Sequence, residues 1–346
     1  MTFSPQCVAT AVGSFPHKDP EAVCDIILQT IPEIPIWPQL PNVDFREQME
    51  IQCCEGMPCV VLDEDNQKMF FDTSGDFTWD LEKFYENVVS EKLDYFKISP
   101  DFSRGIYQME KKLTQIDRSS IKYLKHQVTG PVTFGLGRVD ENKRSIYYNE
   151  IFRDIVVKAI VMKTRWLLNK FKPFGFKQIC FIDEPIFSAF GSSTYVSVQR
   201  SDVVQYLREV IDTVHEEGVI AGSHCCGNTE WTILIDAGVD IISFDAYNYG
   251  DTIGYYADRV NDFLKNGGVL AWGIVPTSEK ISDENPESLI KKLEQLIENL
   301  AGKGIDKNLI WEQCLLTPSC GTGSRSIELS DKTFHQLSEV SRLLRR

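Results

Sequence analysis

The sequence lacks any long hydrophobic run. No stretch approaches the roughly 18 apolar residues of a membrane-spanning helix. The N-terminal segment contains Pro5, Gly13 and Pro16 and has no basic start of the kind found in secretory signal peptides. These absences predict a cytoplasmic protein that does not take a membrane as its partner.

The chain is also short of positive charge. It has 36 Lys and Arg residues against 50 Asp and Glu residues, a net charge of -14. A nucleic-acid backbone binds clustered Lys and Arg, so this balance predicts that nucleic acid is not a partner. A protein with a basic docking face is still compatible with the charge.

The 10 cysteines show no regular disulfide spacing. A chain of 346 residues does not need disulfides to be stable, so the pattern indicates a reducing compartment. Cys53, Cys54 and Cys59 lie close together but lack a histidine partner. We expect them to be ordinary buried thiols, because free cysteine is among the most buried residue types.

Short apolar runs alternate with amphipathic stretches along the whole chain. Stretches such as 202–217, 256–264 and 286–301 have apolar residues at helical spacing. Eight strand-helix alternations predict an α/β fold, a single (β/α)8 TIM barrel, with residues 1–346 as one domain. The predicted strands are 8–12, 34–40, 123–128, 178–183, 219–224, 240–245, 269–275 and 313–317.

One region, about 55–102, does not fit the alternation. Residues 60–62 and 69–71 flank an acidic turn and predict a hairpin, and residues 81–93 predict a helix. We therefore expect an insertion after the second strand that covers the mouth of the barrel.

Three residues from distant parts of the chain form a candidate metal site. His224 and Cys226 follow an apolar strand, where side chains two apart point the same way, whereas Cys225 faces the other side. Cys320 follows another strand, in a loop containing glycine. One imidazole and two thiolates suit zinc, and three scattered ligands leave a position open, as in catalytic sites. The alternative is that His224 satisfies a backbone carbonyl and both cysteines pack in the core.

Other polar residues follow the predicted strands at their carboxyl ends. They are Gly13 and Ser14 after the first strand, Asp183 after the fourth and Asp245 after the sixth. Active sites of TIM barrels lie at this face, so these residues are expected to meet the zinc site there.

Five motifs in this order resemble the catalytic domain of cobalamin-independent methionine synthase. The wider group includes uroporphyrinogen decarboxylase and the corrinoid-dependent thiol methyltransferases. The resemblance spans nearly the whole chain. Each motif alone is weak, but five motifs in the same order make the resemblance specific. The motifs are Gly13-Ser14-Phe15-Pro16, Thr129-Gly130-Pro131-Val132-Thr133, Ile182-Asp183-Glu184-Pro185, His224-Cys225-Cys226 and Ser319-Cys320-Gly321.

The resemblance implies a zinc methyltransferase that acts on a thiol. His224, Cys226 and Cys320 match the family's zinc ligands. Asp245 stands where the synthases have a further glutamate ligand, and its side chain is shorter. Three roles are open for Asp245: a ligand, a hydrogen-bond partner of the ligand histidine, or a substrate contact.

The resemblance also implies a binding site for an amino acid. Asp183 matches the acid that holds the amino group of homocysteine. Gly13 and Ser14 match the turn that binds its carboxylate. Single-barrel relatives have similar sequence around residues 37–58, and on this basis Gln39, Arg46 and Glu55 are placed near the site, Glu55 as a substrate-binding residue.

The departures from the family concern the methyl donor. The full synthase has two barrels, and this chain has one. The folate-using enzymes carry a tryptophan that stacks on the pterin, whereas this chain has Phe134-Gly135-Leu136-Gly137-Arg138 there. Single-barrel relatives take the methyl group from a corrinoid on a separate protein. Because the chain has no D-x-H-x-x-G corrinoid motif, a methyl-corrinoid would arrive free, as methylcobalamin, or on a corrinoid protein.

The predicted activity is therefore methylation of a small thiol activated by Zn²⁺. A free thiol has a pKa of about 8.5, and a metal cation favours its thiolate form. Asp183 favours homocysteine, which gives methionine, over other thiols. Three alternatives are open: a methyltransferase for coenzyme M, a uroporphyrinogen-decarboxylase-like enzyme and a non-catalytic zinc-binding subunit of a methyl-transfer complex.

Overall fold

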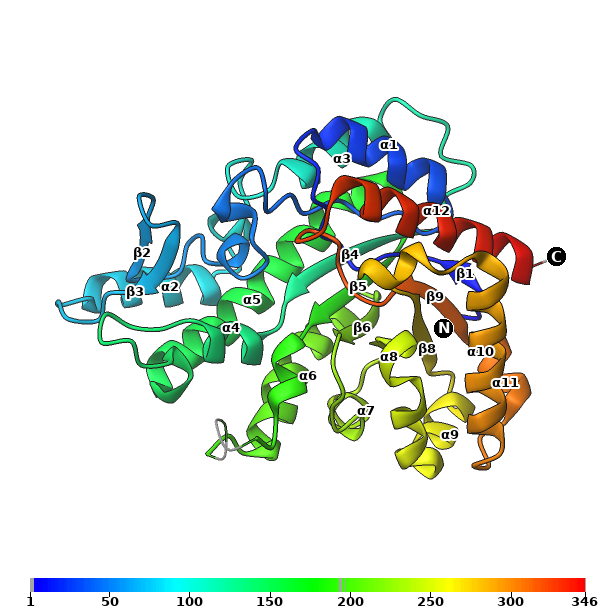
Figure 1. Cartoon of the computed structure of the whole chain (residues 1–346). Coiled ribbons are helices and arrows are strands. Elements are labelled where there is room, and N and C mark those ends of the chain that lie inside the picture. Colours follow the sequence, from blue (N-terminus) through cyan, green and yellow to red (C-terminus); the bar gives the residue numbers. More distant parts are fainter. Residues whose placement is uncertain (1–2, 193–194, 196, 346) are drawn as a thin grey trace.

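The fold is built around a curled parallel sheet, which lies at the centre of the molecule in Figure 1. The computed structural model describes residues 3–192, 195 and 197–345. Within these residues seven parallel strands follow the order β1-β9-β8-β7-β6-β5-β4. Their bounds are β1 Val8–Ala9, β4 Tyr123–Thr129, β5 Lys177–Asp183, β6 Ile220–Cys225, β7 Ile241–Phe244, β8 Val269–Val275 and β9 Cys314–Pro318.

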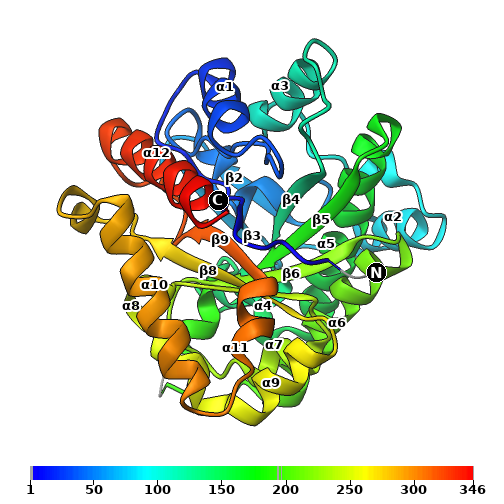
Figure 2. The ribbon, with the colours of Figure 1, turned by 90° about the vertical axis from the view of Figure 1, so that its right-hand side faces the viewer.

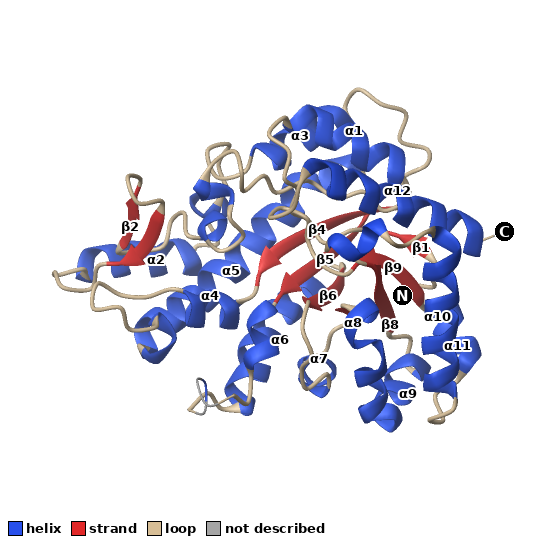
Figure 3. Cartoon of the chain, in the orientation of Figure 1, coloured by secondary structure: helices blue, strands red, loops and turns tan. Residues whose placement is uncertain are grey.

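Helices surround this sheet, as the views in Figures 2 and 3 show. The predicted amphipathic stretches are confirmed as α6 (Arg200–Glu216), α9 (Ala257–Lys265) and α10 (Pro286–Ala301). No helix in the described part of the chain has the length and apolarity that crossing a membrane requires. The other α-helices are α1 Pro20–Thr30, α2 Thr78–Val89, α3 Arg104–Leu113, α4 Pro131–Gly137, α5 Glu150–Phe171, α7 Thr232–Ala237, α8 Ala246–Tyr249, α11 Lys307–Glu312 and α12 Ile327–Leu344.

The sheet buries side chains on both of its faces. Every residue of β8 is buried, as expected for a parallel strand covered on both sides. One face packs on the helices, and the other forms a smaller cluster that includes Ile179, Phe181, Ile241 and Leu315. Because side chains alternate along a strand, this second face continues from Phe181 to Asp183 at the carboxyl end of β5.

The predicted strand at 34–40 is not formed. The segment makes only isolated parallel bridges, from Ile36 to Lys125 of β4 and from Gln39 to Ser14. Pro35 and Pro38 have no N–H to donate, which prevents a continuous ladder. The structure is thus an α/β fold with a curled seven-stranded sheet, consistent with a TIM-like barrel, rather than a closed eight-stranded one.

The predicted hairpin in the 55–102 region is confirmed. Strands β2 (Val60–Asp63) and β3 (Lys68–Phe71) pair antiparallel, and α2 follows them. The hairpin lies at one side of the molecule beside α4, at the left of Figure 1. The N–H of Phe71 donates to the carbonyl of Val139, 3.0 Å away, which attaches the hairpin to the segment after α4.

Candidate metal centre

The three predicted ligands come together at the carboxyl end of the sheet. His224 lies near the end of β6, Cys226 directly follows that strand, and Cys320 lies in the loop after β9. One ligand atom from each residue lies within 4.8 Å of the other two. Cys225 points away, as strand alternation predicts, and its Sγ lies 3.6 Å from the carbonyl oxygen of Gly227.

Close backbone packing between β8 and β9 brings Cys320 to the site. The N–H of Ser319 donates to the carbonyl of Val275 at 2.8 Å, and the Thr277 N–H donates to Ser319 Oγ at 3.2 Å. A Cβ at Gly273 would lie 2.5 Å from the Phe244 carbonyl oxygen and 2.8 Å from Ser319 Cα. Only glycine therefore allows β8 to run so close to the loop that carries Cys320.

The imidazole of His224 is held from one side only. Its Nδ1 lies 2.9 Å from Ser243 Oγ on the neighbouring strand β7. Its Nε2 is buried and has no hydrogen-bond partner. A buried polar atom without a partner is costly unless a ligand meets it, so Nε2 is available to a metal.

A hydrogen bond joins the two cysteines and shifts their pKa values in opposite directions. A hydrogen bond from Cys320, together with the His224 imidazole, lowers the pKa of the Cys226 thiol. The same hydrogen bond and burial raise the pKa of Cys320. The cluster thus stabilises a thiolate, the form in which cysteine binds metals.

A pocket of about 300 Å³ opens beside these ligands. Its size suits a ligand as small as an amino acid. The described residues of its wall include no Lys or Arg. Residues 47–49 belong to its wall, whereas no described residue of the 55–102 insertion lines it, and the covering of the barrel mouth by this insertion stays a prediction. The lining residues are Val12, Ser14, Gln39, Pro41, Glu47, Gln48, Met49, Asp183, Pro185, His224, Cys226, Cys320, Gly321, Gly323 and Ser324.

Asp183 is the polar group in this wall with an unused acceptor. Its Oδ1 is buried and has no hydrogen-bond partner. Burial raises the pKa of Asp183 to about 6, against the opposing effects of Lys125 and His224. The carboxylate is therefore suited to receive a cationic group of a bound molecule.

Lys125 lies beneath the site and was not singled out from the sequence. Its Nζ donates to the carbonyl of Val12 at 2.9 Å and lies 4.3 Å from the centre of the Phe181 ring. Burial lowers the pKa of Lys125 to about 8. A lysine inside the apolar run of β4 is the signal that could have found it, because lysine is rarely buried without a role.

The neighbouring carboxylate, Glu184, is fully engaged. It accepts hydrogen bonds from the N–H groups of Val132 and Thr133 and from Thr133 Oγ1, at 3.0, 2.7 and 2.6 Å. A Cβ at Gly130 would lie 2.1 Å from this carboxylate. Glu184 therefore anchors the start of α4, while Asp183 is left to face the pocket.

Gly13 and Ser14 connect the segment after β1 to the loop of Cys320. Ser14 Oγ accepts a hydrogen bond from the Gly323 N–H at 3.2 Å, and its carbonyl accepts from Thr322 N–H at 2.8 Å. A Cβ at Gly321 would lie 2.1 Å from Ser14 Oγ. Ser14 lines the pocket, whereas Gly13 lies behind it and accepts from the Gln39 N–H at 3.0 Å.

Asp245 and Glu55 lie outside the group of ligands and outside the pocket wall. Asp245 caps α8, with its oxygens 2.9 Å from the N–H of Asn248 and 2.7 Å from that residue's amide nitrogen. Glu55 accepts from the N–H of Ser99 at 2.8 Å. Of the residues placed near the site, Gln39 lines the pocket, and Arg46 pairs with Glu64 instead.

The comparisons with known proteins assign no family. No protein-family model and no curated protein matches the chain. Among solved structures, it is similar to a B12-independent methionine synthase from Shewanella sp. W3-18-1 in complex with selenomethionine, with a TM-score of 0.47 and 15% identity. The match covers 70% of this chain and 66% of that chain, just under two thirds. This likeness is too distant to assign an activity.

Proposed function

We propose that the chain is a zinc-dependent thiol S-methyltransferase. The observation that carries the proposal is the convergence of His224, Cys226 and Cys320, with ligand atoms within 4.8 Å of one another beside a small pocket. Nitrogen and thiolate sulfur are the ligands that zinc prefers, and three protein ligands are typical of its catalytic sites.

The residues present fit zinc with one position left for a substrate. Asp245 is not among the three residues whose ligand atoms meet, and its oxygens accept hydrogen bonds from Asn248, so we propose a zinc site without it. Zinc bound to the three residues would favour the thiolate form of an incoming thiol and so make it a nucleophile toward a methyl group. The chain's own part is to hold the thiol beside the open position and to exclude bulk water with the wall formed by residues 47–49.

The charge of the pocket favours homocysteine among small thiols. Asp183 offers an unpaired buried oxygen to an ammonium group, whereas Glu47 is already paired with Arg104 at 2.9 Å. Coenzyme M and porphyrinogens have no ammonium group for Asp183, and the described wall has no Arg or Lys for their acidic groups, whereas the single carboxylate of homocysteine can meet Ser14 there. An amino-thiol therefore suits this wall better than an acidic substrate.

A methyl-corrinoid, free or on a corrinoid protein, is the donor that we propose. Support comes from the segment that carries a pterin-stacking tryptophan in the folate enzymes. Here it forms α4, and Phe134 is fully buried rather than available to stack on a cofactor. A pocket of about 300 Å³ holds a small thiol, so a corrinoid would approach from outside the pocket.

The test combines metal analysis with a methyl-transfer assay. We expect about one zinc per chain and a third sulfur neighbour in X-ray absorption spectra after homocysteine is added. Methylcobalamin should then convert homocysteine to methionine, with coenzyme M as the competing acceptor. Cys320→Ser should lose zinc and activity, while Cys225→Ser, the same change on the opposite side of the strand, should keep both.

Each other outcome contradicts part of the proposal. One zinc whose sulfur neighbours do not change with thiols would support a structural metal in a non-catalytic subunit. Absence of zinc after growth and purification with added zinc would overturn the metal site itself. Activity with coenzyme M but not homocysteine would overturn the assigned role of Asp183.

A further inference from the structure

We infer that Ser243 is a positioning residue that determines which ring nitrogen of His224 meets the metal. The inference rests on the proposed zinc site. Ser243 lies in the middle of β7, directly paired with His224 of β6 in the register of the two strands. Its side chain is fully buried, and Oγ lies 2.9 Å from His224 Nδ1.

The protonation of an imidazole explains why this contact matters. A ring nitrogen that binds a metal carries no proton, so a neutral ring must carry its proton on the other nitrogen. With Nε2 toward the cysteines, that proton is on Nδ1 and donates to Ser243 Oγ. Such partners of ligand histidines fix both the tautomer and the orientation of the ring.

A competing partner lies on the opposite side of His224. Asp183 of β5 is also directly paired with His224 in the sheet, and its Oδ1 has no hydrogen-bond partner. A carboxylate accepts a stronger hydrogen bond than a hydroxyl, so a ring released from Ser243 would turn an N–H toward Asp183. Ser243 thus keeps Nε2 directed at the metal and keeps Asp183 free for the substrate.

Zinc affinity, measured by competition with a chromophoric chelator, tests the inference. We expect Ser243→Ala to weaken zinc binding about 10- to 100-fold, the usual effect of removing such a partner. Ser243→Thr, which keeps the hydroxyl, should restore most of the affinity. Ser223→Ala is the matched control. Ser223 is buried on β6, next to His224 in the chain, but its hydroxyl donates to the Ile182 carbonyl at 2.7 Å and not to His224.

A second measurement reads the tautomer directly. In the zinc-loaded protein labelled with ¹⁵N-histidine, long-range ¹H–¹⁵N correlations should show the His224 proton on Nδ1, assigned by its loss in His224→Ala. Ser243→Ala should broaden or shift this signal, and the thermal midpoint of the metal-free variant shows whether it is folded.

The failure of this inference is distinct from the failure of the proposed function. If the wild-type protein binds zinc and Ser243→Ala binds it equally well with the same His224 tautomer, Ser243 has no positioning role and the zinc site stands. If the wild-type protein binds no zinc, both are overturned. If Ser223→Ala weakens zinc binding as much as Ser243→Ala, the effect is structural and the inference is again wrong.

Discussion

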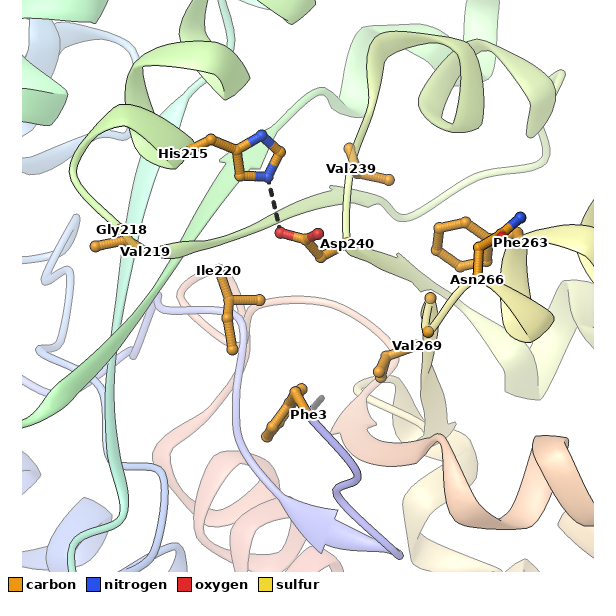
Figure 4. Close-up of a pocket in the computed structure, with 12 residues that line it drawn as sticks. Phe3, His215, Gly218, Val219, Ile220, Val239, Asp240, Phe263, Asn266 and Val269 are labelled. Atoms are coloured by element: carbon orange, nitrogen blue, oxygen red, sulfur yellow. Dashed lines mark hydrogen bonds and ion pairs between the residues drawn. The ribbon is translucent and has the colours of Figure 1, made fainter. Parts of the chain in front are cut away.

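The two ends of the sheet each hold a histidine beside a cavity, and the two histidines differ in how their ring nitrogens are satisfied. At the amino end, a cavity of about 400 Å³ is lined by residues from the starts of β6 and β8 (Figure 4). His215 Nε2 there lies 2.9 Å from Asp240 Oδ2, and the same oxygen accepts from the Ala221 N–H at 2.8 Å. His215 and Asp240 therefore satisfy each other and hold α6, β6 and the start of β7 together.

The carboxyl end has the smaller cavity, and two unsatisfied polar atoms lie beside it. His224 Nε2 and Asp183 Oδ1 are both buried there without a partner, beside two thiols. Cavity size therefore does not identify the functional end. What favours the carboxyl end in our proposal is that two buried polar atoms without a partner lie there beside two thiols and a pocket.

The largest expected effect comes from removing one histidine at a time. His224→Ala should weaken zinc binding by at least about 1,000-fold, since about 10–16 kcal/mol of zinc binding is shared among a few ligands. His215→Ala should leave zinc affinity unchanged. Chelator competition measures both, and equal losses in the two variants would contradict the distinction between the two ends.

Metal binding should also stabilise the fold through the carboxyl end alone. Zinc at about 1,000 times its Kd should add about 4 kcal/mol to the free energy of unfolding, which raises Tm by several degrees. Calorimetry with and without a chelator measures the shift. Cys226→Ala should abolish it, and its persistence in that variant would place the metal elsewhere.

Removing the carboxylate of Asp183 should affect the substrate rather than the metal. Asp183→Asn should raise KM for homocysteine about 10- to 100-fold, because a charge-assisted hydrogen bond contributes about 1.5–3 kcal/mol. The matched acceptor 4-mercaptobutanoate lacks the amino group and should show no such change. Zinc content should be unaltered, and its loss would show that Asp183 supports the metal site instead.

The smallest effect is expected from the ion pair at the amino end. The hydrogen bond with Asp240 raises the pKa of His215 above its ordinary value. The stabilisation is therefore fully present below about pH 6.5 and is lost as the pH rises through the folded pKa. His215→Gln should flatten the dependence of unfolding free energy on pH in the metal-free protein by about 0.2–1 kcal/mol, because both side chains are partly exposed. An unchanged slope in urea titrations from pH 6 to 8 would show that the pair contributes nothing.

Most of the sheet could be predicted because most of its strands contain short apolar runs, of which the one in β8 is the longest without a polar residue. The run 269–275 matches β8 at both ends, and alternation along β6 placed His224 and Cys226 on one side with Cys225 on the other. The convergence of Cys320 with these two residues was also predicted, because carboxyl ends of parallel strands meet at one edge.

The strand predicted at 34–40 is not formed, and the physical reason cannot be seen from the number of apolar residues alone. The segment 34–40 is apolar enough for a strand, but Pro35 and Pro38 remove the donors that a strand needs. The role of Glu55 was implied by resemblance and stays a prediction, and its hydrogen bond with the Ser99 N–H depends on a loop path that a single sequence does not reveal. The contact of Ser243 with His224, on which our inference rests, was not predicted because it depends on the register between two strands, which local sequence does not encode.

The segment that joins the two edges of the sheet has a consequence for motion. Only scattered backbone bonds hold residues 34–40, among them those from Lys125 to Pro35 and from Phe15 to Gln39, both 2.9 Å. Because this segment has few backbone hydrogen bonds to neighbouring strands, its local unfolding costs less free energy than that of the continuous strands. Its backbone amides should therefore exchange with deuterium first. Gln39 of this segment belongs to the pocket wall, and Pro41 of that wall follows directly after it. Local opening of residues 34–40, rather than movement of the ligand-bearing strands, would therefore set how quickly a molecule enters or leaves the pocket.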